Sequence, residues 1–369
     1  MNSQPRPPSS VPLDLRLRQL VAQALPGAEL LSAVALGADS VSHEATAKGA
    51  GYGAPLRLEV RHDGVLKAFV LHSATANPFG HERRADRAAE MLVAADTFGL
   101  LPAHTRVIDV GAYRAAGFVS LQGCGEFYLL TEYAEGNPYA ADLRHIAHTR
   151  VLEQKDVERV DRLVHYLVDI HRERLPEASL YTRSIRDLLG SGEGIFGLVD
   201  GYPESTAGID SARLNQIERG CLEWRWRLKG RAHRLVRIHG DFHPFNVLFE
   251  ADSKLAVLDA SRGSAGDAAD DVAAMAVNYV FFANFEPTLW QSTFQHLWRR
   301  FWDRYLVLSG DTELLAVVAP FLAWRCLVLA NPVWYPDVAA EHRVRLFDFV
   351  DLTLASERFD PELAQRVFA

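Results

Sequence analysis

Two patterns of apolar residues divide this chain: a strand-like alternation in its first third and a helical spacing in most of the remainder. Apolar and polar residues alternate over 56–60, an Asp-Gly turn follows at 63–64, and a second apolar run covers 65–71. Alternation on both sides of an Asp-Gly pair predicts a β-hairpin. The apolar run 30–36 could form another strand, and the spacing over 13–25 predicts a helix before it.

The hairpin is followed by mixed signals. A helical pattern covers 80–98, and short apolar runs at 107–110 and 118–121 could be strands. The compact apolar run 127–131 predicts a buried strand. It leads into a segment containing Gly, Asn and Pro that breaks regular structure, so we place a domain boundary after Tyr133.

Helical spacing dominates beyond this boundary. Over 156–174 the apolar residues fall on one face of a helix, and the tail 271–369 is almost wholly helical in pattern. The segment 175–233 has the features of a partly helical insertion. We therefore expect an α+β chain with a disordered lead-in at 1–12, an N-terminal domain at 13–133 and a helical C-terminal domain at 134–369.

The composition agrees with an ordinary globular protein. The chain has 369 residues, 49% of them hydrophobic and 23% charged, enough for about two domains of ~150 residues. A net charge of -8 argues against general nucleic-acid binding, which needs a basic surface. The three cysteines form no CxxC pair, which argues against a zinc site. The chain lacks a signal-peptide pattern and any run of roughly 18–20 apolar residues, so we expect a cytoplasmic protein without a membrane partner.

Candidate chemistry gathers around a predicted strand–loop–strand. Asp241 lies five residues before Asn246, and a short apolar run after them ends in Asp259. Mg²⁺ prefers oxygen ligands of this kind, usually one or two carboxylates together with substrate phosphates. The same residues match phosphoryl transfer, in which one Asp accepts the hydroxyl proton while an Asn and a second Asp hold metal. Apolar strands at 235–238, 247–249 and 255–258 would support them rigidly.

Two histidines flank this set. We expect His239 to hold the loop rather than to transfer protons. His243 could pair with it as a metal site, but two histidines without a third ligand are more often structural.

A glycine-rich stretch upstream is a weaker signal. Lys48, Gly49 and Gly51 lie between two predicted strands. Backbone N–H groups of such a link can cover nucleotide phosphates, although an ordinary flexible turn has the same composition.

The order of these parts, with His239-Gly240-Asp241 and Asn246, resembles the aminoglycoside phosphotransferase and choline kinase-like family, relatives of protein kinases. The resemblance covers roughly residues 30–350. It implies a bilobal protein-kinase-like fold, with a small antiparallel β-sheet lobe and a larger helical lobe. It also implies that Asp241 is the catalytic base in a loop shared with His239. Asn246 would then be a metal ligand and Asp259 the main one.

Two stretches after Asp259 qualify the resemblance. Ala260, Ser261 and Arg262 depart from the family pattern, which leaves a second metal open. The sequence 266–272 is similar to the family's helix start, so Asp271 is expected to anchor the catalytic loop through backbone hydrogen bonds. Capping of the helix is the alternative role for the acids in this stretch.

The nucleotide-binding residues have alternatives. The kinase scheme needs a strand Lys paired with a helix Glu. Lys67 with Glu82 is the preferred pair, Glu90 is the alternative partner, and His72 could occupy the Lys position. Thr131, Glu132, Tyr133 and Ala134 form the expected hinge, whose backbone would meet adenine.

We therefore expect an ATP- and Mg²⁺-dependent phosphotransferase acting on a hydroxyl of a small molecule. A nucleotide-binding regulator without turnover is the alternative. The acceptor stays open: Trp324, Trp334, Tyr335 and Asp337 could hold a cationic amine, or the aromatic residues could simply be core.

Overall fold

The chain divides into two compact units, and the division falls between Leu130 and Thr131. The computed structural model describes residues 13–36, 55–114, 117–250, 254–260 and 262–369. The division falls close to the boundary placed after Tyr133.

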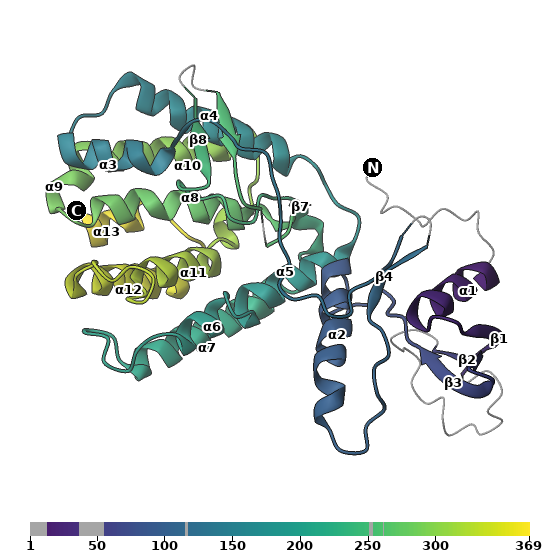
Figure 1. The fold of residues 1–369 in the computed structure, drawn as a ribbon. Coiled ribbons are helices and arrows are strands. Elements are labelled where there is room, and N and C mark those ends of the chain that lie inside the picture. Colours follow the sequence, from purple (N-terminus) through teal and green to yellow (C-terminus); the bar gives the residue numbers. More distant parts are fainter. Residues whose placement is uncertain (1–12, 37–54, 115–116, 251–253, 261) are drawn as a thin grey trace. The chain divides into compact units, whose positions relative to one another are not determined.

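The first unit is built on an antiparallel sheet in the order β1-β2-β3 (Figure 1). Its strands are β1 (Glu29–Ala35), β2 (Leu56–His62) and β3 (Val65–Leu71). Asp63 and Gly64 connect β2 to β3, and both have positive φ, 51° and 76°. Two positive φ angles give the turn twist that matches paired strands, so the predicted hairpin is confirmed.

Helix α1 (Leu13–Ala24) covers this sheet with apolar side chains. Leu17 and Val21 of the helix pack in a small core with Leu30, Leu58 and Val60 of the strands. The helix expected over 13–25 is therefore confirmed, and its apolar face is what attaches it to the sheet.

The rest of the first unit is less regular. It contains helix α2 (Arg84–Thr97), the short 3-10 helix Phe98–Leu100, and a strand pair formed by β4 (Gly111–Tyr113) and β5 (Phe118–Ser120). The strand predicted at 107–110 is wrong, since β4 begins at Gly111.

The buried strand predicted at 127–131 is also wrong. The segment forms no strand, and Tyr128, Leu129 and Leu130 are each about nine-tenths exposed. An apolar run becomes a strand only where a neighbouring strand offers hydrogen bonds, and none is paired with this one in the described structure.

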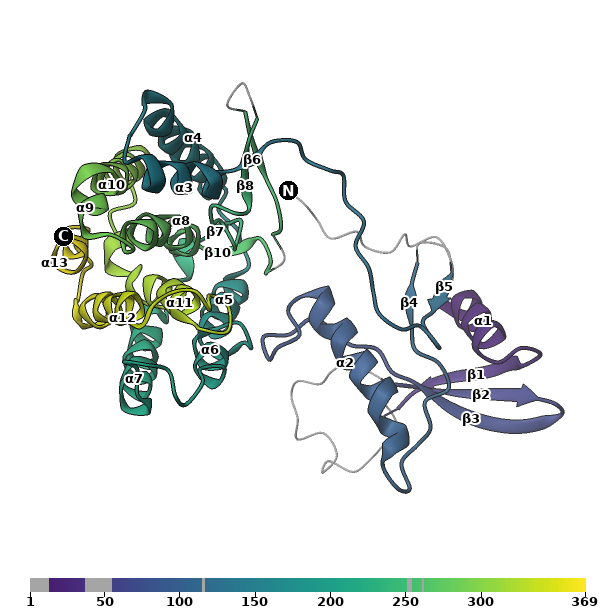
Figure 2. The same cartoon turned by 60° about the vertical axis from the view of Figure 1, so that its left-hand side comes forward.

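The second unit carries two small antiparallel sheets (Figure 2). One has the order β6-β8-β9 and the other pairs β10 with β7. Their bounds are β6 (Asn137–Pro138), β7 (Leu235–Arg237), β8 (Val247–Phe249), β9 (Leu255–Val257) and β10 (Ala265–Asp267).

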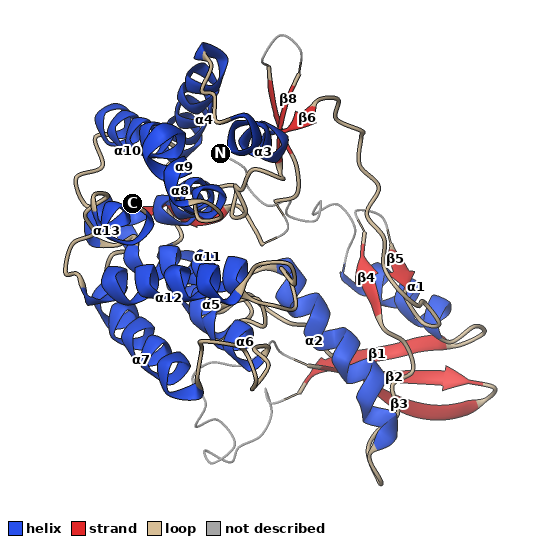
Figure 3. Cartoon of the chain, turned by 90° about the vertical axis from the view of Figure 1, so that its left-hand side faces the viewer, coloured by secondary structure: helices blue, strands red, loops and turns tan. Residues whose placement is uncertain are grey.

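Helices make up most of the second unit (Figure 3). They are α3 (Tyr139–Thr149), α4 (Gln154–His171), α5 (Ala178–Gly190), α6 (Ile195–Asp200), α7 (Ser211–Leu228), α8 (Ala268–Ala283), α9 (Pro287–Leu289), α10 (Gln295–Ser309), α11 (Ala319–Ala330), α12 (Ala340–Ala355) and α13 (Leu363–Phe368). Short 3-10 helices lie at Ala232–Arg234 and Leu314–Ala316, and a π-helical turn at Trp290–Phe294 precedes α10.

Helix α8 lies at the centre of the helical core. All but one of its sixteen residues are buried, and beyond its acidic first turn they are apolar except for Asn278, whose side chain donates to the Ala274 carbonyl. A helix that is hydrophobic all round must be enclosed by others. Helices α3, α4, α10, α11 and α13 pack around it. The first turn of α8 carries acidic residues, and this end of the helix directly follows β10.

The fold class expected from the sequence is confirmed: small antiparallel sheets combine with a mainly helical body. No helix among the described residues has the length and apolar character needed to cross a membrane.

Candidate active site

The loop that carries Asp241 leaves β7 and enters β8. In the following hairpin Val247 pairs with Val257, and the Leu258 N–H donates to the Asn246 carbonyl at 2.8 Å. This register places Asn246 opposite the residues that lead into Asp259. The predicted hairpin of β8 and β9 is confirmed, but β7 does not join it. β7 pairs with β10 instead, so two sheets hold the loop from its two ends.

Asp271, in the first turn of α8, anchors the loop. Its carboxylate accepts the backbone N–H of His239 at 2.7 Å and of Gly240 at 2.8 Å. His171 Nε2 lies 3.1 Å from the same carboxylate, and His171 Nδ1 lies 2.7 Å from the Tyr305 hydroxyl. The expected backbone anchoring by Asp271 is therefore confirmed.

The charge of Asp271 is held by these partners. Burial raises the pKa of the Asp271 carboxyl, but the hydrogen bond and charge of His171 and the backbone N–H groups of His239 and Gly240 together lower it. Asp267 takes the capping role instead, since it is the N-cap of α8 and accepts the Ala269 N–H at 3.0 Å.

Gly240 lets the loop turn sharply. Its φ is +82°, and a Cβ there would lie 2.6 Å from the Gly263 carbonyl oxygen. Both the left-handed backbone and the close approach require glycine. The residue directly before Asp241 is thus fixed by sterics.

The Asp241 carboxylate is surrounded by donors. Oδ1 accepts from Arg262 Nη2 and, at 2.7 Å, from Arg325 Nη1. Oδ2 lies 3.3 Å from Asn246 Nδ2 and 3.5 Å from His243 Nε2. Burial raises the pKa of Asp241, but the His243 hydrogen bond and the charges of Arg325 and Arg262 outweigh it and hold that pKa well below its usual range. Asp241 is therefore ionised at neutral pH.

Asn246 and Asp259 present oxygen atoms on the adjoining hairpin. Asn246 Nδ2 donates to the Asp241 carbonyl at 3.1 Å, which leaves Asn246 Oδ1 as an acceptor. Asp259 is exposed, has φ +50°, and its carboxylate makes no hydrogen bond or ion pair with the described residues. An amide oxygen and a free carboxylate are donors that suit Mg²⁺.

His239 and His243 both support the loop. His239 Nδ1 accepts the Asp241 N–H at 3.3 Å, and its Nε2 is buried without a partner among the described residues. His243 Nδ1 accepts the Phe245 N–H at 3.2 Å, so its Nε2 carries the proton that faces Asp241. Within the described part of the chain, no three His, Cys, Asp or Glu side chains gather into a metal site.

Sequence reasoning missed the arginines beside Asp241. Arg325 of α11 is buried and bridges Asp241 to Asp270 Oδ1, the latter at 2.7 Å. Arg262 Nε donates to the Gly240 carbonyl at 2.9 Å. A signal was present for one of them: Arg325 is the one charged residue of the otherwise apolar helix Ala319–Ala330, and a charge in that position must be paired.

The nucleotide-side residues are not brought together in this structure. Lys67 lies on β3, is exposed, and makes no ion pair with Glu82 or Glu90 among the described residues. Glu82 precedes α2 instead of lying on it, and Glu90 lies 3.3 Å from His81. His72 follows β3 and is exposed.

The remaining predicted nucleotide contacts fall in loops. Lys48, Gly49 and Gly51 lie outside the described residues. Residues 131–134 form no regular structure and precede β6; Thr131, Glu132 and Tyr133 are exposed and Ala134 is half-buried. Their roles stay predictions.

The candidate acceptor residues separate into different environments. Trp324 is buried, and its Nε1 donates to the Glu193 carbonyl at 2.7 Å. Trp334 is half-exposed, and the Tyr335 ring packs edge-on against Phe281 at 5.5 Å. Trp324 therefore belongs to the packed interior, as the core interpretation predicted, and Asp337 makes no described ion pair.

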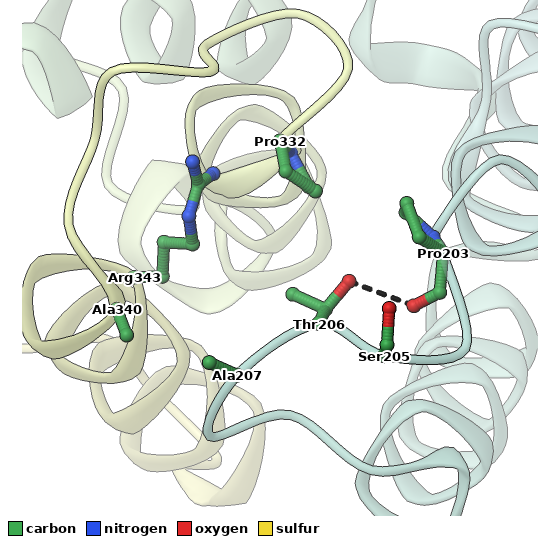
Figure 4. Close-up of a pocket in the computed structure, with 7 residues that line it drawn as sticks. All are labelled: Pro203, Ser205, Thr206, Ala207, Pro332, Ala340 and Arg343. Carbon is green, nitrogen blue, oxygen red and sulfur yellow. Dashed lines mark hydrogen bonds between the residues drawn. The ribbon is translucent and has the colours of Figure 1, made fainter.

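A cavity of about 270 Å³ lies away from the Asp241 loop, between the residues after α6 and the α11–α12 connection (Figure 4). Arg343 points toward it and donates to the carbonyls of Ala330 and Tyr335, each at 2.7 Å. The Thr206 hydroxyl donates to the Pro203 carbonyl at 2.7 Å. Arg343 and Thr206 are thus bound to backbone carbonyls, and the lining residues contain no Asp, Glu, His, Cys or Lys that could form a catalytic group.

A model of the phosphotransferase enzyme family, APH, matches residues 60–306, well over half of the chain. No curated protein sequence matches.

Among solved structures, a glucosamine kinase matches with 20% identity and a TM-score of 0.42, over 60% of this chain and 59% of its own. The chain thus spans about three-fifths of that protein. A choline kinase from Streptococcus pneumoniae matches with 14% identity and a TM-score of 0.35, over 93% and 98% of the two chains. An ethanolamine kinase from Plasmodium vivax matches with 13% identity and a TM-score of 0.34, over 85% and 78%.

Proposed function

Because this chain belongs to the phosphotransferase enzyme family, we propose that it transfers the γ-phosphoryl group of ATP, with Mg²⁺, to a hydroxyl group of a small molecule. The observation that carries the proposal is the loop in which Asp241 and Asn246 are fixed beside each other and anchored to Asp271. A rigid support of this kind is what positioning catalysis requires.

Asp241 is the group that receives the acceptor hydroxyl. Its carboxylate is ionised, so it can accept a hydrogen bond from the hydroxyl and orient the oxygen toward the phosphorus. A carboxylate with a lowered pKa is a weak base. The hydroxyl proton therefore passes to Asp241 only as the new P–O bond forms, and orientation is its larger contribution.

Asn246 and Asp259 would hold Mg²⁺ through Asn246 Oδ1 and the Asp259 carboxylate. When bound, Mg²⁺ neutralises charge on the phosphate oxygens of ATP. Two protein oxygens fit this ion, since Mg²⁺ keeps several waters and completes its shell with phosphates. The free carboxylate of Asp259 supports this assignment.

The test is ADP release by the full chain with ATP, Mg²⁺ and a broad panel of small alcohols. We expect turnover by the natural sequence, and a loss of about a hundredfold or more in kcat for Asp241→Asn, the scale of a positioned acid–base group. Asp169→Asn is the matched control, because Asp169 is exposed and pairs with Arg172 on the surface. Unchanged turnover in Asp241→Asn would refute the assignment.

Asp259→Asn tests the metal assignment separately. We expect a higher Mg²⁺ concentration for half-maximal turnover, because one charged ligand is lost. An unaltered Mg²⁺ requirement would remove Asp259 from the metal site.

A nucleotide-binding regulator without turnover is the second candidate, favoured by the absence of a Lys67 ion pair in the described structure. It predicts thermal stabilisation by ATP and Mg²⁺ without ADP release for any acceptor. Turnover with one acceptor excludes it.

A further inference from the structure

One carboxylate oxygen of Asp241, Oδ1, is fully used by groups of the chain itself. Arg262 and Arg325 both donate to Oδ1, while Asn246 and His243 face Oδ2. A carboxylate oxygen has about two lone-pair sites. An acceptor hydroxyl that binds Oδ1 must therefore replace one of the two arginines.

Arg325 is the donor least able to move. Its Nη1 binds Asp241, and its Nη2 binds Asp270 at 2.7 Å and the Gly240 carbonyl at 3.2 Å. Its side chain is 7% exposed. The Nε atom is also buried and has no partner in the described structure, so the guanidinium keeps one unused donor.

Arg262 is the donor that can be exchanged. It lies in the connection after β9, and its side chain is 24% exposed. Its guanidinium contacts Asp241 and the Gly240 carbonyl, both of which are also bound by Arg325. If Arg262 moves away, the Asp241 carboxylate still has a cationic partner, because Arg325 remains bound to it.

The two guanidinium groups share one aromatic partner. Both pack on one indole, with their central carbons 4.4 Å (Arg262) and 4.0 Å (Arg325) from the Trp324 ring centre. Burial and the neighbouring charge of Arg325 lower the pKa of Arg262, as expected for two like charges held close together.

A third arginine acts on the same region from α3. Burial and the charge of Asp241 raise the pKa of Tyr335, while the charge of Arg144 lowers it, so the phenol lies in the field of both groups. The Arg144 guanidinium carbon lies 5.1 Å from the Phe245 ring centre, on the loop of Asp241.

We propose that the acceptor is a hydroxy acid, in which a carboxylate near the phosphorylated hydroxyl takes over the guanidinium of Arg262 from Asp241. This inference rests on the proposed phosphotransferase function and names its substrate class. An ammonium group at this place would lie beside two positively charged arginines. The Trp324 ring could otherwise bind a cation, but both guanidinium groups already pack on it. A carboxylate instead forms charge-assisted hydrogen bonds with the planar guanidinium of Arg262. Asp241 then loses that donor and can accept a hydrogen bond from the hydroxyl. This proposal differs from the cationic acceptor considered from the sequence, and the experiment below compares the two.

The experiment compares acceptors that differ only in charge. Two matched series serve: glucuronate, glucose and 6-amino-6-deoxyglucose, and glycerate, glycerol and 3-amino-1,2-propanediol. Binding to the full chain is measured by calorimetry, and ADP release is measured in parallel. We expect an acid to bind at least about tenfold more tightly than its ammonium counterpart, the scale of one charge-assisted contact. A panel in which no acid binds better than its ammonium counterpart overturns the inference.

Variants of Arg262 identify the residue responsible. Arg262→Gln is expected to remove the preference for acids, and Arg262→Lys to retain part of it through charge. Arg213→Gln is the matched control, because Arg213 is a partly buried arginine that pairs with Asp348 and Asp351 at the α7–α12 contact. A preference that persists in Arg262→Gln would contradict this role, whereas thermal unfolding verifies that the variant is folded.

The two hypotheses fail differently. Tight binding of acids without ADP release from any acceptor would refute the phosphotransferase reaction and keep the charge preference. ADP release with ammonium compounds alone would keep the reaction and overturn the hydroxy-acid inference.

Discussion

Arg325 Nη1 lies 2.7 Å from Asp241 Oδ1, although 84 residues separate the two in the chain. The contact joins α11 to the loop between β7 and β8. It fixes the carboxylate that we assign to the acceptor hydroxyl, and it sets the charge of that carboxylate.

The first prediction concerns this contact and pH. Arg325 and Arg262, together with the His243 hydrogen bond, lower the pKa of Asp241 against the effect of burial. In Arg325→Met one of these charges is lost, so the pKa of Asp241 should rise toward its ordinary value. Because the proposed reaction uses the ionised form of Asp241, the acid limb of kcat/KM should move to higher pH. Arg299→Met, an exposed arginine paired with Glu362, is the control and should leave the limb in place.

The second prediction concerns Asp271 and stability. Asp271→Asn should lower the free energy of unfolding by about 2–3 kcal/mol, because buried N–H groups lose their charged acceptor. The pKa of Asp271 is lowered in the folded state, so its stabilising effect is complete above the ordinary value of 3.8. The effect is lost as pH falls through the lower folded value. Urea unfolding of both proteins should show a gap at neutral pH that narrows in acid below this value. A constant gap would contradict the assignment.

The third prediction concerns the turn at Gly240. A Cβ there would lie 2.6 Å from the Gly263 carbonyl, at φ +82°. Gly240→Ala should therefore displace the loop, cost at least about 1–2 kcal/mol and reduce kcat. Gly220→Ala is the opposite case: Gly220 lies within α7, where a Cβ would meet only the Leu354 side chain at 3.5 Å. That variant should be stabilised by roughly 0.5–1 kcal/mol and keep its activity. Equal behaviour of the two variants would refute the steric argument.

The fourth prediction concerns an ion pair outside the site. Arg234 binds Asp267 with two hydrogen bonds of 2.8 Å and Asp311 with bonds of 2.8 and 2.9 Å. Arg234→Met leaves the buried Asp267 carboxylate without its cation, which should cost about 3–5 kcal/mol. Thermal or urea unfolding measures this loss. The exposed Arg299→Met should cost less than about 1 kcal/mol. Activity per folded molecule should be unchanged, and a specific loss of kcat would place Arg234 in the catalytic machinery.

Sequence alone determined the features that depend on neighbours along the chain. The Asp-Gly turn predicted the β2–β3 hairpin, because two residues with positive φ suffice to join paired strands. The spacing of Asp241 and Asn246 identified the candidate loop for the same reason, since a short connection brings these two residues together locally. Asp271 could be identified from its place at a helix start.

Only the tertiary structure decided which distant partners meet. An apolar run forms a strand only beside a neighbouring strand, and residues 127–131 have none in the described structure. The sequence likewise did not show that β7 pairs with β10 instead of β8. The sequence could not identify a partner for Lys67, because the spacing of charged residues along a chain does not determine which of them come close in the fold. Arg325 stood out as a lone charge in an apolar helix, yet its partners Asp241 and Asp270 followed only from packing α11 against α8 and the loop. The sequence shows which side chains are charged. The pKa of Asp241, however, depends on its burial and on the nearby arginines, and only the fold determines these.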